Sequence, residues 1–357
     1  MSSTSIPAGR FAFAPARPAT RQFDLDRAKG FAILLVVFGH LVARRTPPGA
    51  EWYDPLRITV YLFHMPLFMY LSGYVTFLSG AARTPGTKWP RLLRRRAARL
   101  LVPFAVFGVA VLSAKLVAAH FVHVDNVPPT FWVGVRDLVW STEHSPATEV
   151  WYIATLFVFA IVTPALLALD RSRVLLIAVA AVLFVLPLWR VIYLDRITTY
   201  FIFFVAGGLA ADAGPRWLRF VDRIWPLALA ALALVALPVA LGWFHFDWTT
   251  GQQGFPYKWA MLAAGLLSLP AMHGLVRAGA TARVPMLALL GRYVFVIYLL
   301  NTVFIGVTKA VLLKFVSWDG AHFLPFATVL LLAGVCGPLL TKRYVLRYVP
   351  ALDRATD

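Results

Sequence analysis

Residues 26–40 read Asp-Arg-Ala-Lys-Gly-Phe-Ala-Ile-Leu-Leu-Val-Val-Phe-Gly-His. The run is apolar enough for a membrane helix, with Lys29 near its beginning and His40 at its end. The two residues are eleven positions apart, close to three helical turns, so we expect both side chains on one helix face, about 16 Å apart along the axis. An ionisable side chain inside a membrane helix is costly and is by default a functional-site candidate. Lys29 and His40 are therefore the first two candidates.

The composition indicates an all-α polytopic membrane protein. Of its 357 residues, 60% are hydrophobic and only 14% are charged, and the mean hydropathy is +0.73, whereas a soluble domain is about 25% charged. We find no internal repeat and expect a single bundle of about ten transmembrane helices. The expected spans are 28–43, 56–79, 99–119, 149–169, 173–190, 197–213, 226–244, 257–277, 287–311 and 322–341.

The distribution of charge predicts the orientation of the bundle. Arginine and lysine are about three times as frequent at the two termini and in the loops on their side as in the alternate loops. The positive-inside rule therefore places both termini in the cytoplasm and the acidic, aromatic loop 120–148 outside. The net charge of +18 is spread between apolar segments. That pattern indicates contact with anionic membrane lipids and argues against a nucleic-acid partner.

Two tails are expected outside the bundle. Residues 1–25 are polar, basic and rich in proline and alanine, and they lack the apolar segment of a secretory signal, so we predict a disordered cytoplasmic tail. Residues 26–345 form the transmembrane domain, and residues 346–357 a second cytoplasmic tail. The single Cys336 excludes an intramolecular disulfide.

His40 is expected in the outer half of the first span, where an imidazole is able to act as a general base on a hydroxyl. A core histidine that hydrogen-bonds a neighbouring helix is an equal alternative at this stage. Lys29 is expected at the cytoplasmic end, where a lysine that only anchors the helix at the interface is the simpler alternative.

The second span contains His64, two residues before Pro66. A proline inside a span removes a backbone hydrogen bond and favours a kink, while Ser72 and Gly73 permit a close approach of another helix. One interpretation is a kinked packing helix. The other is a second wall of the cavity around His40, with His64 as a polar contact.

A cluster of arginines lies on a predicted cytoplasmic helix that leads into the third span: Arg91, Arg94, Arg95 and Arg99. Their charge serves orientation and lipid contact in one interpretation. In the other, they bind a phosphate-rich ligand such as the nucleotide of coenzyme A, because guanidinium groups bind phosphate bidentately. Charge alone does not separate the two interpretations.

The outer face carries carboxylates beside aromatic rings, with Glu149 and Trp151 at the start of the fourth span and Glu143 in the loop before it. An aromatic belt with solvated acids explains this pattern, and so does a sugar-binding surface. Asn301 in the ninth span is a buried amide that needs hydrogen-bond partners. No Walker-type loop, dinucleotide-binding glycine pattern or metal-ligand spacing is present, which disfavours ATP-driven transport and zinc catalysis.

Four blocks of the sequence resemble membrane-bound acyltransferase family 3, and within it the branch similar to fucose 4-O-acetylase. They are Asp26–His40, His64–Tyr74, Trp151–Phe157 and Leu290–Leu300. The first two together are specific, and the last two are weak alone. The blocks follow the usual order and extend over most of the chain.

The resemblance implies a multi-pass enzyme of the bacterial inner membrane. Such an enzyme moves an acyl group, most often acetyl, from a cytoplasmic acyl-CoA to a sugar hydroxyl of an extracytoplasmic glycan or lipid-linked sugar, with no permanently bound cofactor or metal. His40 falls at the family's essential histidine, and Lys29 where many members have arginine. Asn301 falls where members often have histidine, so no role is carried over to it.

From the residues and the resemblance together, we predict His40 and Lys29 as catalytic residues. The predicted acyl-CoA contacts are Arg91, Arg94, Arg95 and Arg99, and the predicted acceptor contacts are His64, Glu149, Trp151 and Glu143. A secondary transporter or flippase for a glycan or small anion is the rival hypothesis, and a catalytically silent partner of a glycan assembly complex is a third. The sequence indicates neither the acceptor, the acyl chain nor the oligomeric state.

Overall fold

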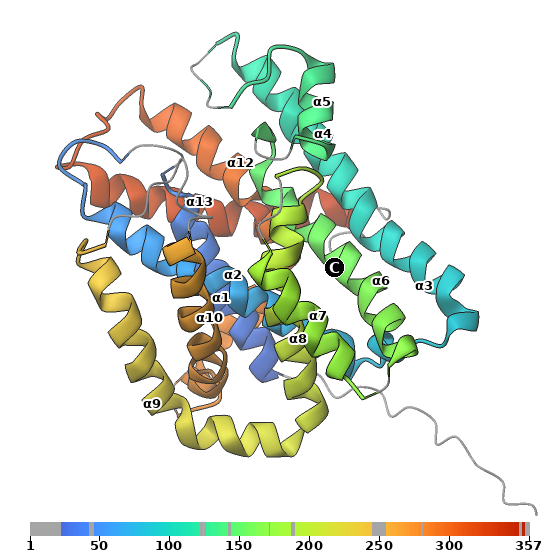
Figure 1. Cartoon of the computed structure of the whole chain (residues 1–357). Coiled ribbons are helices and arrows are strands. Elements are labelled where there is room, and N and C mark those ends of the chain that lie inside the picture. Colours follow the sequence, from blue (N-terminus) through green and yellow to red (C-terminus); the bar gives the residue numbers. More distant parts are fainter. Residues whose placement is uncertain are drawn as a thin grey trace, which may run out of the picture.

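The computed structural model describes residues 23–42, 46–121, 124, 126–141, 144–170, 172–186, 190–244, 255–279, 281–349 and 352–353. Every regular element within these residues is helical, and the long helices pack side by side in one bundle (Figure 1). The predicted all-α membrane fold is thereby confirmed. The two predicted tails lie largely outside the described residues.

Among the described residues, ten helices have twelve residues or more: α1 (Phe23–His40), α2 (Tyr53–Leu78), α4 (Val102–Ala118), α6 (Trp151–Leu169), α7 (Val174–Val185), α8 (Leu194–Ala213), α9 (Pro215–Ala240), α10 (Phe255–Leu275), α12 (Val294–Leu312) and α13 (Phe323–Tyr344). Three shorter helices accompany them: α3 (Trp89–Arg96), α5 (Phe131–Val139) and α11 (Pro285–Arg292). The helix α3 continues into α4 through a π-helical turn at Ala97–Leu101.

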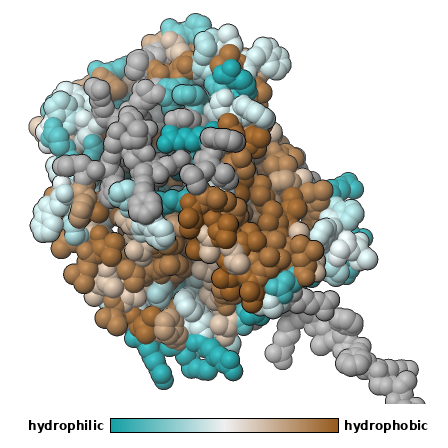
Figure 2. Space-filling model, viewed as in Figure 1, coloured by the Kyte–Doolittle hydropathy of each residue, from teal (hydrophilic) through white to brown (hydrophobic). Residues whose placement is uncertain are grey.

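Seven helices of the described chain are long and apolar enough to cross a membrane: Tyr53–Leu78, Gly86–Ala118, Trp151–Leu169, Leu194–Ala213, Pro215–Ala240, Val294–Leu312 and Phe323–Tyr348. Figure 2 shows apolar side chains over a broad band of one face, with hydrophilic side chains gathered above and below it. A bilayer would cover such a band. The count of ten spans and the cytoplasmic termini stay predictions.

Two predicted spans differ from the helices observed. The span expected at 287–311 is broken at Tyr293, whose backbone (φ −102°, ψ 17°) separates α11 from α12. The span expected at 173–190 ends as a helix at Val185, because Leu186 is extended (ψ 131°) and precedes a proline in the sequence, which disfavours the helical conformation. The outer loop expected at 120–148 contains the helix α5.

Glycines allow two pairs of helices to approach closely. A Cβ atom at Gly73 of α2 would clash with the carbonyl oxygen of Phe204 in α8, and one at Gly207 of α8 would clash with that of Tyr70 in α2. The close helix approach predicted at Gly73 is therefore present. A second close approach lies between α1 and α11, where a Cβ atom at Gly291 would clash with the carbonyl oxygen of Asp26. This last contact places the break before α12 directly beside the start of α1.

Ion pairs join helix ends on the side predicted to be cytoplasmic. Asp212 at the end of α8 pairs with Arg83 after α2 (2.5 Å) and with Arg173 before α7 (3.0 Å). Three helices are thereby tied together at one membrane surface. The predicted orientation assigned all three helix ends to this surface.

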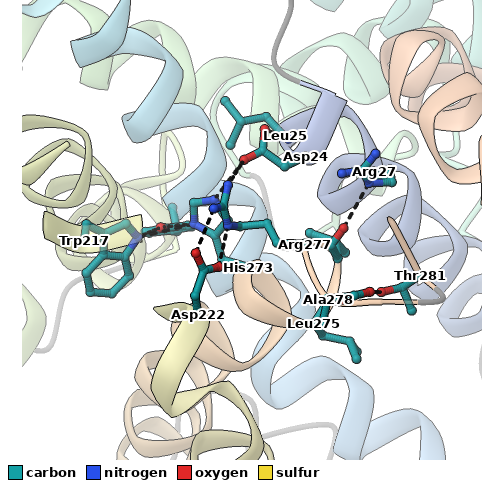
Figure 3. A network of polar contacts seen from close by, with 12 residues as sticks. Asp24, Leu25, Arg27, Trp217, Asp222, His273, Leu275, Arg277, Ala278 and Thr281 are labelled. Atoms are coloured by element: carbon teal, nitrogen blue, oxygen red, sulfur yellow. Dashed lines mark hydrogen bonds and ion pairs between the residues drawn. The ribbon is translucent and has the colours of Figure 1, made fainter. Parts of the chain in front are cut away.

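A second network lies at the start of α1 (Figure 3). Arg277 after α10 pairs with Asp24 of α1 (2.9 Å) and with Asp222 of α9 (2.7 Å). Burial raises the pKa of the Asp24 carboxyl, but the neighbouring His273 and Arg277 lower it by more, so this pKa lies below its ordinary value. Asp24 is therefore ionised, and it fixes the beginning of α1 against α9 and α10.

The α2–α8 contact gives a testable expectation for stability. We expect Gly207→Ala to lower the apparent melting temperature of the detergent-solubilised protein, because overpacking costs about 1–3 kcal/mol. Gly306→Ala in α12 is the matched control, since a Cβ at Gly306 meets nothing within 4 Å. Thermal unfolding followed by size-exclusion chromatography measures both variants. Equal melting temperatures would contradict the close approach.

Candidate functional site

His40 is the last residue of α1 and is half-buried. Its Nδ1 atom lies 2.9 Å from Oδ1 of Asn301 in α12. The amide nitrogen of the fully buried Asn301 donates to the carbonyl oxygens of Ile297 (2.9 Å) and Tyr298 (2.8 Å). The amide oxygen of Asn301 therefore accepts the hydrogen bond from His40. Nδ1 of the neutral His40 ring then carries the hydrogen, and Nε2 has the lone pair. This is the tautomer that a base or a nucleophile requires at Nε2.

Tyrosines of α2 hold the end of α1 in place. The last carbonyl groups of a helix have no partner within that helix. Here Tyr53 donates its hydroxyl hydrogen to the carbonyl oxygen of Phe38, and Tyr61 donates to that of Gly39 at 2.8 Å. The two tyrosines therefore fix the backbone on which His40 is carried.

Arg57 of α2 lies between these tyrosines, and its side chain fixes the chain just beyond His40. It is buried, at 3% exposure, and donates to the carbonyl oxygen of Val42 at 2.8 Å. It also pairs with Asp54 at 2.7 Å. The spacing of four residues from Tyr53 to Arg57 to Tyr61 puts all three side chains on one face of α2.

His64 lies one turn further along α2, near His40. It is buried, its Nδ1 lies 2.9 Å from the carbonyl oxygen of Val60, and its ring is 5.0 Å from that of Tyr61. The two histidines are close enough to interact electrostatically. Because Nδ1 faces a carbonyl, which only accepts, the lone pair of the neutral His64 ring is also at Nε2. The helix α2 continues through Pro66.

Glu149, a predicted acceptor contact just before α6, is joined to the helices that carry the histidine pair. Tyr298, three residues before Asn301, donates to the carbonyl oxygen of Glu149, and Glu149 is within electrostatic reach of Tyr61. The segment that leads into α6 is thereby joined to both α12 and α2. The structure thus brings Glu149 into the cluster that contains His40 and His64.

Trp151 extends the cluster with a second aromatic surface. Its ring is stacked on that of Tyr200 in α8, with centroids 5.0 Å apart and planes at 27°. The guanidinium of Arg196 lies 5.4 Å from the Trp151 ring. Glu143, the remaining predicted acceptor contact, lies outside the described residues.

The arginines predicted to bind acyl-CoA lie on other elements than this cluster. The four arginines, Arg91, Arg94, Arg95 and Arg99, are exposed on α3 and the π-helical turn after it. In Figure 1, α3 lies at the margin of the bundle, away from α1 and α2. Lys29 is half-buried in α1, on the same continuous helix as His40 and about three turns before it. The structure therefore separates the basic region of α3 and the start of α1 from the histidine cluster at the end of α1.

The sequence interpretation missed the side chains that position His40. It predicted Asn301 only as a buried amide in need of partners, and it assigned nothing to Tyr53, Arg57 or Tyr61. The signal for the last three was their four-residue spacing on one helix face. In the described part of the chain, no group of three His, Cys, Asp or Glu side chains is arranged to hold a metal ion.

Comparison with known proteins gives a family match over most of the chain. A family model described as an acyltransferase domain matches residues 22–343. The chain is similar to the nodulation protein NolL of Sinorhizobium fredii, with 36% identity over 121 residues, or 33% of this chain and 31% of that protein. NolL of Mesorhizobium japonicum is 35% identical over 103 residues, or 28% of this chain and 26% of that protein. These alignments cover about a third or less of each relative, and no solved structure matches.

The contact between His40 and Asn301 is testable by a double-mutant cycle on stability. We expect His40→Ala and Asn301→Ala to be non-additive, with a coupling of about 0.5–2 kcal/mol, because each single change leaves the other side chain without its buried partner. The exposed His322 provides the control, since His322→Ala and Asn301→Ala share no contact and should add. Additive effects in the first pair would rule out the hydrogen bond.

Proposed function

The chain belongs to the acyltransferase family, and on that premise we propose that it is an integral membrane O-acyltransferase. The acyl group, most often acetyl, comes from a cytoplasmic acyl-CoA. The acceptor is a hydroxyl of an extracytoplasmic glycan or lipid-linked sugar. The observation that carries this proposal is the outer histidine cluster, in which Asn301 leaves the Nε2 lone pair of His40 unprotonated.

The Nε2 atom of His40 takes the proton of the acceptor hydroxyl as that oxygen attacks the thioester carbonyl. The carbon–sulfur bond then breaks, and the proton passes from Nε2 to the departing thiolate of coenzyme A. The hydroxyl proton therefore leaves with the thiol of coenzyme A on the donor side, as the acyl group moves to the acceptor. In a second route Nε2 itself attacks the thioester carbonyl and expels the thiolate of coenzyme A. The acceptor hydroxyl then attacks the acyl group on Nε2, the carbon–nitrogen bond breaks, and the hydroxyl proton passes to Nε2 and from there to the thiolate. Both routes need the same lone pair and the same positioning by Asn301.

The acceptor sugar lies between the histidines and the aromatic surface of α6. Trp151 offers an apolar ring face, while Glu149 and His64 offer hydrogen-bond partners for sugar hydroxyls. Glu149 and His64 adjoin the His40 cluster through Tyr298 and Tyr61. Trp151 is joined to it through Tyr152, whose ring contacts that of Tyr298. Glu143 is assigned to the same surface on sequence grounds alone.

The donor binds from the opposite side. Its phosphates contact the exposed arginines Arg91, Arg94, Arg95 and Arg99, since guanidinium groups form paired hydrogen bonds with phosphate oxygens. Lys29 binds a donor phosphate or an anionic intermediate at the cytoplasmic end of α1. The thioester arm then extends along α1 toward His40, over the roughly 16 Å that separates the two residues along the helix.

Loss of His40 should abolish transfer. We expect His40→Ala to lower the rate of labelled acetyl transfer from acetyl-CoA to membrane glycan by about 10²–10⁴-fold, the usual contribution of a positioned base. The exposed His322→Ala, compared at matched expression, should transfer at the wild-type rate. Unchanged transfer by the His40 variant would refute the assignment, and solute flux without acyl consumption would favour a transporter instead.

Loss of arginine charge on α3 should weaken donor binding without changing the chemical step. We expect Arg94→Gln/Arg95→Gln to raise KM for acetyl-CoA by roughly tenfold and to leave kcat near the wild-type value, because charge-assisted phosphate contacts act on binding. Arg343→Gln/Arg347→Gln removes the same charge from exposed positions at the C-terminal end. An equal KM in the two double variants would show that α3 does not bind the donor.

A further inference from the structure

An apolar groove lies between α8, α9 and α10, away from the histidine cluster. It has a cavity volume of about 400 Å³, within the roughly 300–1,000 Å³ of sites for small molecules. Its walls include Ala206, Leu209, Ala213, Phe220, Leu266 and Pro270. None of these side chains takes part in the proposed reaction.

The groove runs parallel to the helices and ends at the cytoplasmic surface. Its wall on α8 extends from Ala206 to Ala213, about 10 Å along the axis. Ala213 follows Asp212, the residue that pairs with Arg83 and Arg173 at that surface. An extended acyl chain of a lipid in one bilayer leaflet also runs parallel to the helices, and it starts at the same membrane surface as this groove.

Polar groups at the base of the groove are already satisfied by one another. The indole nitrogen of Trp217 donates to the Tyr70 hydroxyl (2.7 Å), which in turn lies 2.7 Å from Nδ1 of the buried His273. Figure 3 shows the Trp217 indole directed toward His273. Because the hydrogen-bonding groups of Tyr70 and Trp217 are occupied, both residues present mainly ring carbon to the groove. The groove therefore fits hydrocarbon and not a sugar.

Positive charge lies at the mouth of the groove. Arg216, Arg219 and Arg223 are exposed on the first turns of α9. At 100° per residue they share one helix face with Phe220, which lines the groove. The nearby carboxylate of Asp222 is paired with Arg277 through two hydrogen bonds of 2.7 and 2.9 Å, so it does not cancel the charge of these arginines.

We propose that this groove binds an anionic phospholipid of the cytoplasmic leaflet. One acyl chain lies along α8 from Ala213 toward Ala206, and the phosphate contacts Arg216 and Arg219. The apolar walls of the groove match the acyl chain of such a lipid, and the arginines at its mouth match the phosphate. Each basic residue at the membrane surface adds affinity for an anionic lipid. The site is independent of the proposed acyl transfer.

The full-length protein, released from nanodiscs that contain equal amounts of phosphatidylglycerol and phosphatidylcholine, tests the site by native mass spectrometry. We expect the wild-type protein to retain phosphatidylglycerol preferentially. Arg216→Gln/Arg219→Gln should reduce that retention roughly tenfold or more, from the usual contribution of two basic contacts. The double variant Arg343→Gln/Arg347→Gln removes equal charge elsewhere and should retain phosphatidylglycerol as the wild type does.

A second variant tests the hydrocarbon part separately. Ala213 is exposed at the mouth of the groove, so Ala213→Trp should fold normally and reduce retention of both lipids by blocking entry. Equal retention of the two lipids by the wild type, or equal loss in both arginine double variants, would overturn the proposal. Displacement of phosphatidylglycerol by free coenzyme A would also overturn it, because a nucleotide site would then occupy these arginines.

Discussion

The hydrogen bond between Nδ1 of His40 and Oδ1 of Asn301 is the interaction on which the proposed chemistry depends. It joins the end of α1 to α12 and selects the tautomer with a lone pair at Nε2. Two backbone carbonyls of α12 accept the amide hydrogens of Asn301. The amide oxygen of Asn301 therefore faces His40, and this orientation determines the tautomer of the histidine. The backbone of α12 thereby determines the tautomer of a side chain on α1.

A membrane offers no water to satisfy buried polar groups, so each such group requires a partner within the protein. This constraint explains why the polar contacts of α1 concentrate at its two ends. At its C-terminal end, Tyr53 and Tyr61 satisfy its last carbonyl groups. At its N-terminal end, Asp24 pairs with Arg277. Between them α1 packs through apolar residues, so the position of His40 is determined by contacts at both ends of a rigid helix.

The helical class of the fold and the broad layout of the candidate site were predictable from local sequence. Hydropathy located most long helices, and the family blocks drew attention to His40 and His64. The break at Tyr293 was not predicted from the apolar run, and it lies beside a contact of Gly291 with the backbone of Asp26, which is far away in the sequence. Asn301 was predicted as a buried amide, but its partner His40 was not, because the two residues are 261 positions apart in the sequence. The helix break and the partner of Asn301 involve contacts between distant segments, which the periodicity and composition of the sequence do not reveal.

Nitrogen NMR of the ¹⁵N-histidine-labelled protein in lipid tests the central claim most directly. The chain has eight histidines, and the spectrum of His40→Gln assigns the signals of His40 by difference. At a pH well above the ordinary histidine pKa of about 6.5, the account predicts a protonated Nδ1 and an unprotonated Nε2 in His40. It also predicts that Asn301→Ala abolishes this preference. A hydrogen on Nε2 in the wild-type protein, or an unchanged spectrum in the Asn301 variant, would contradict the account.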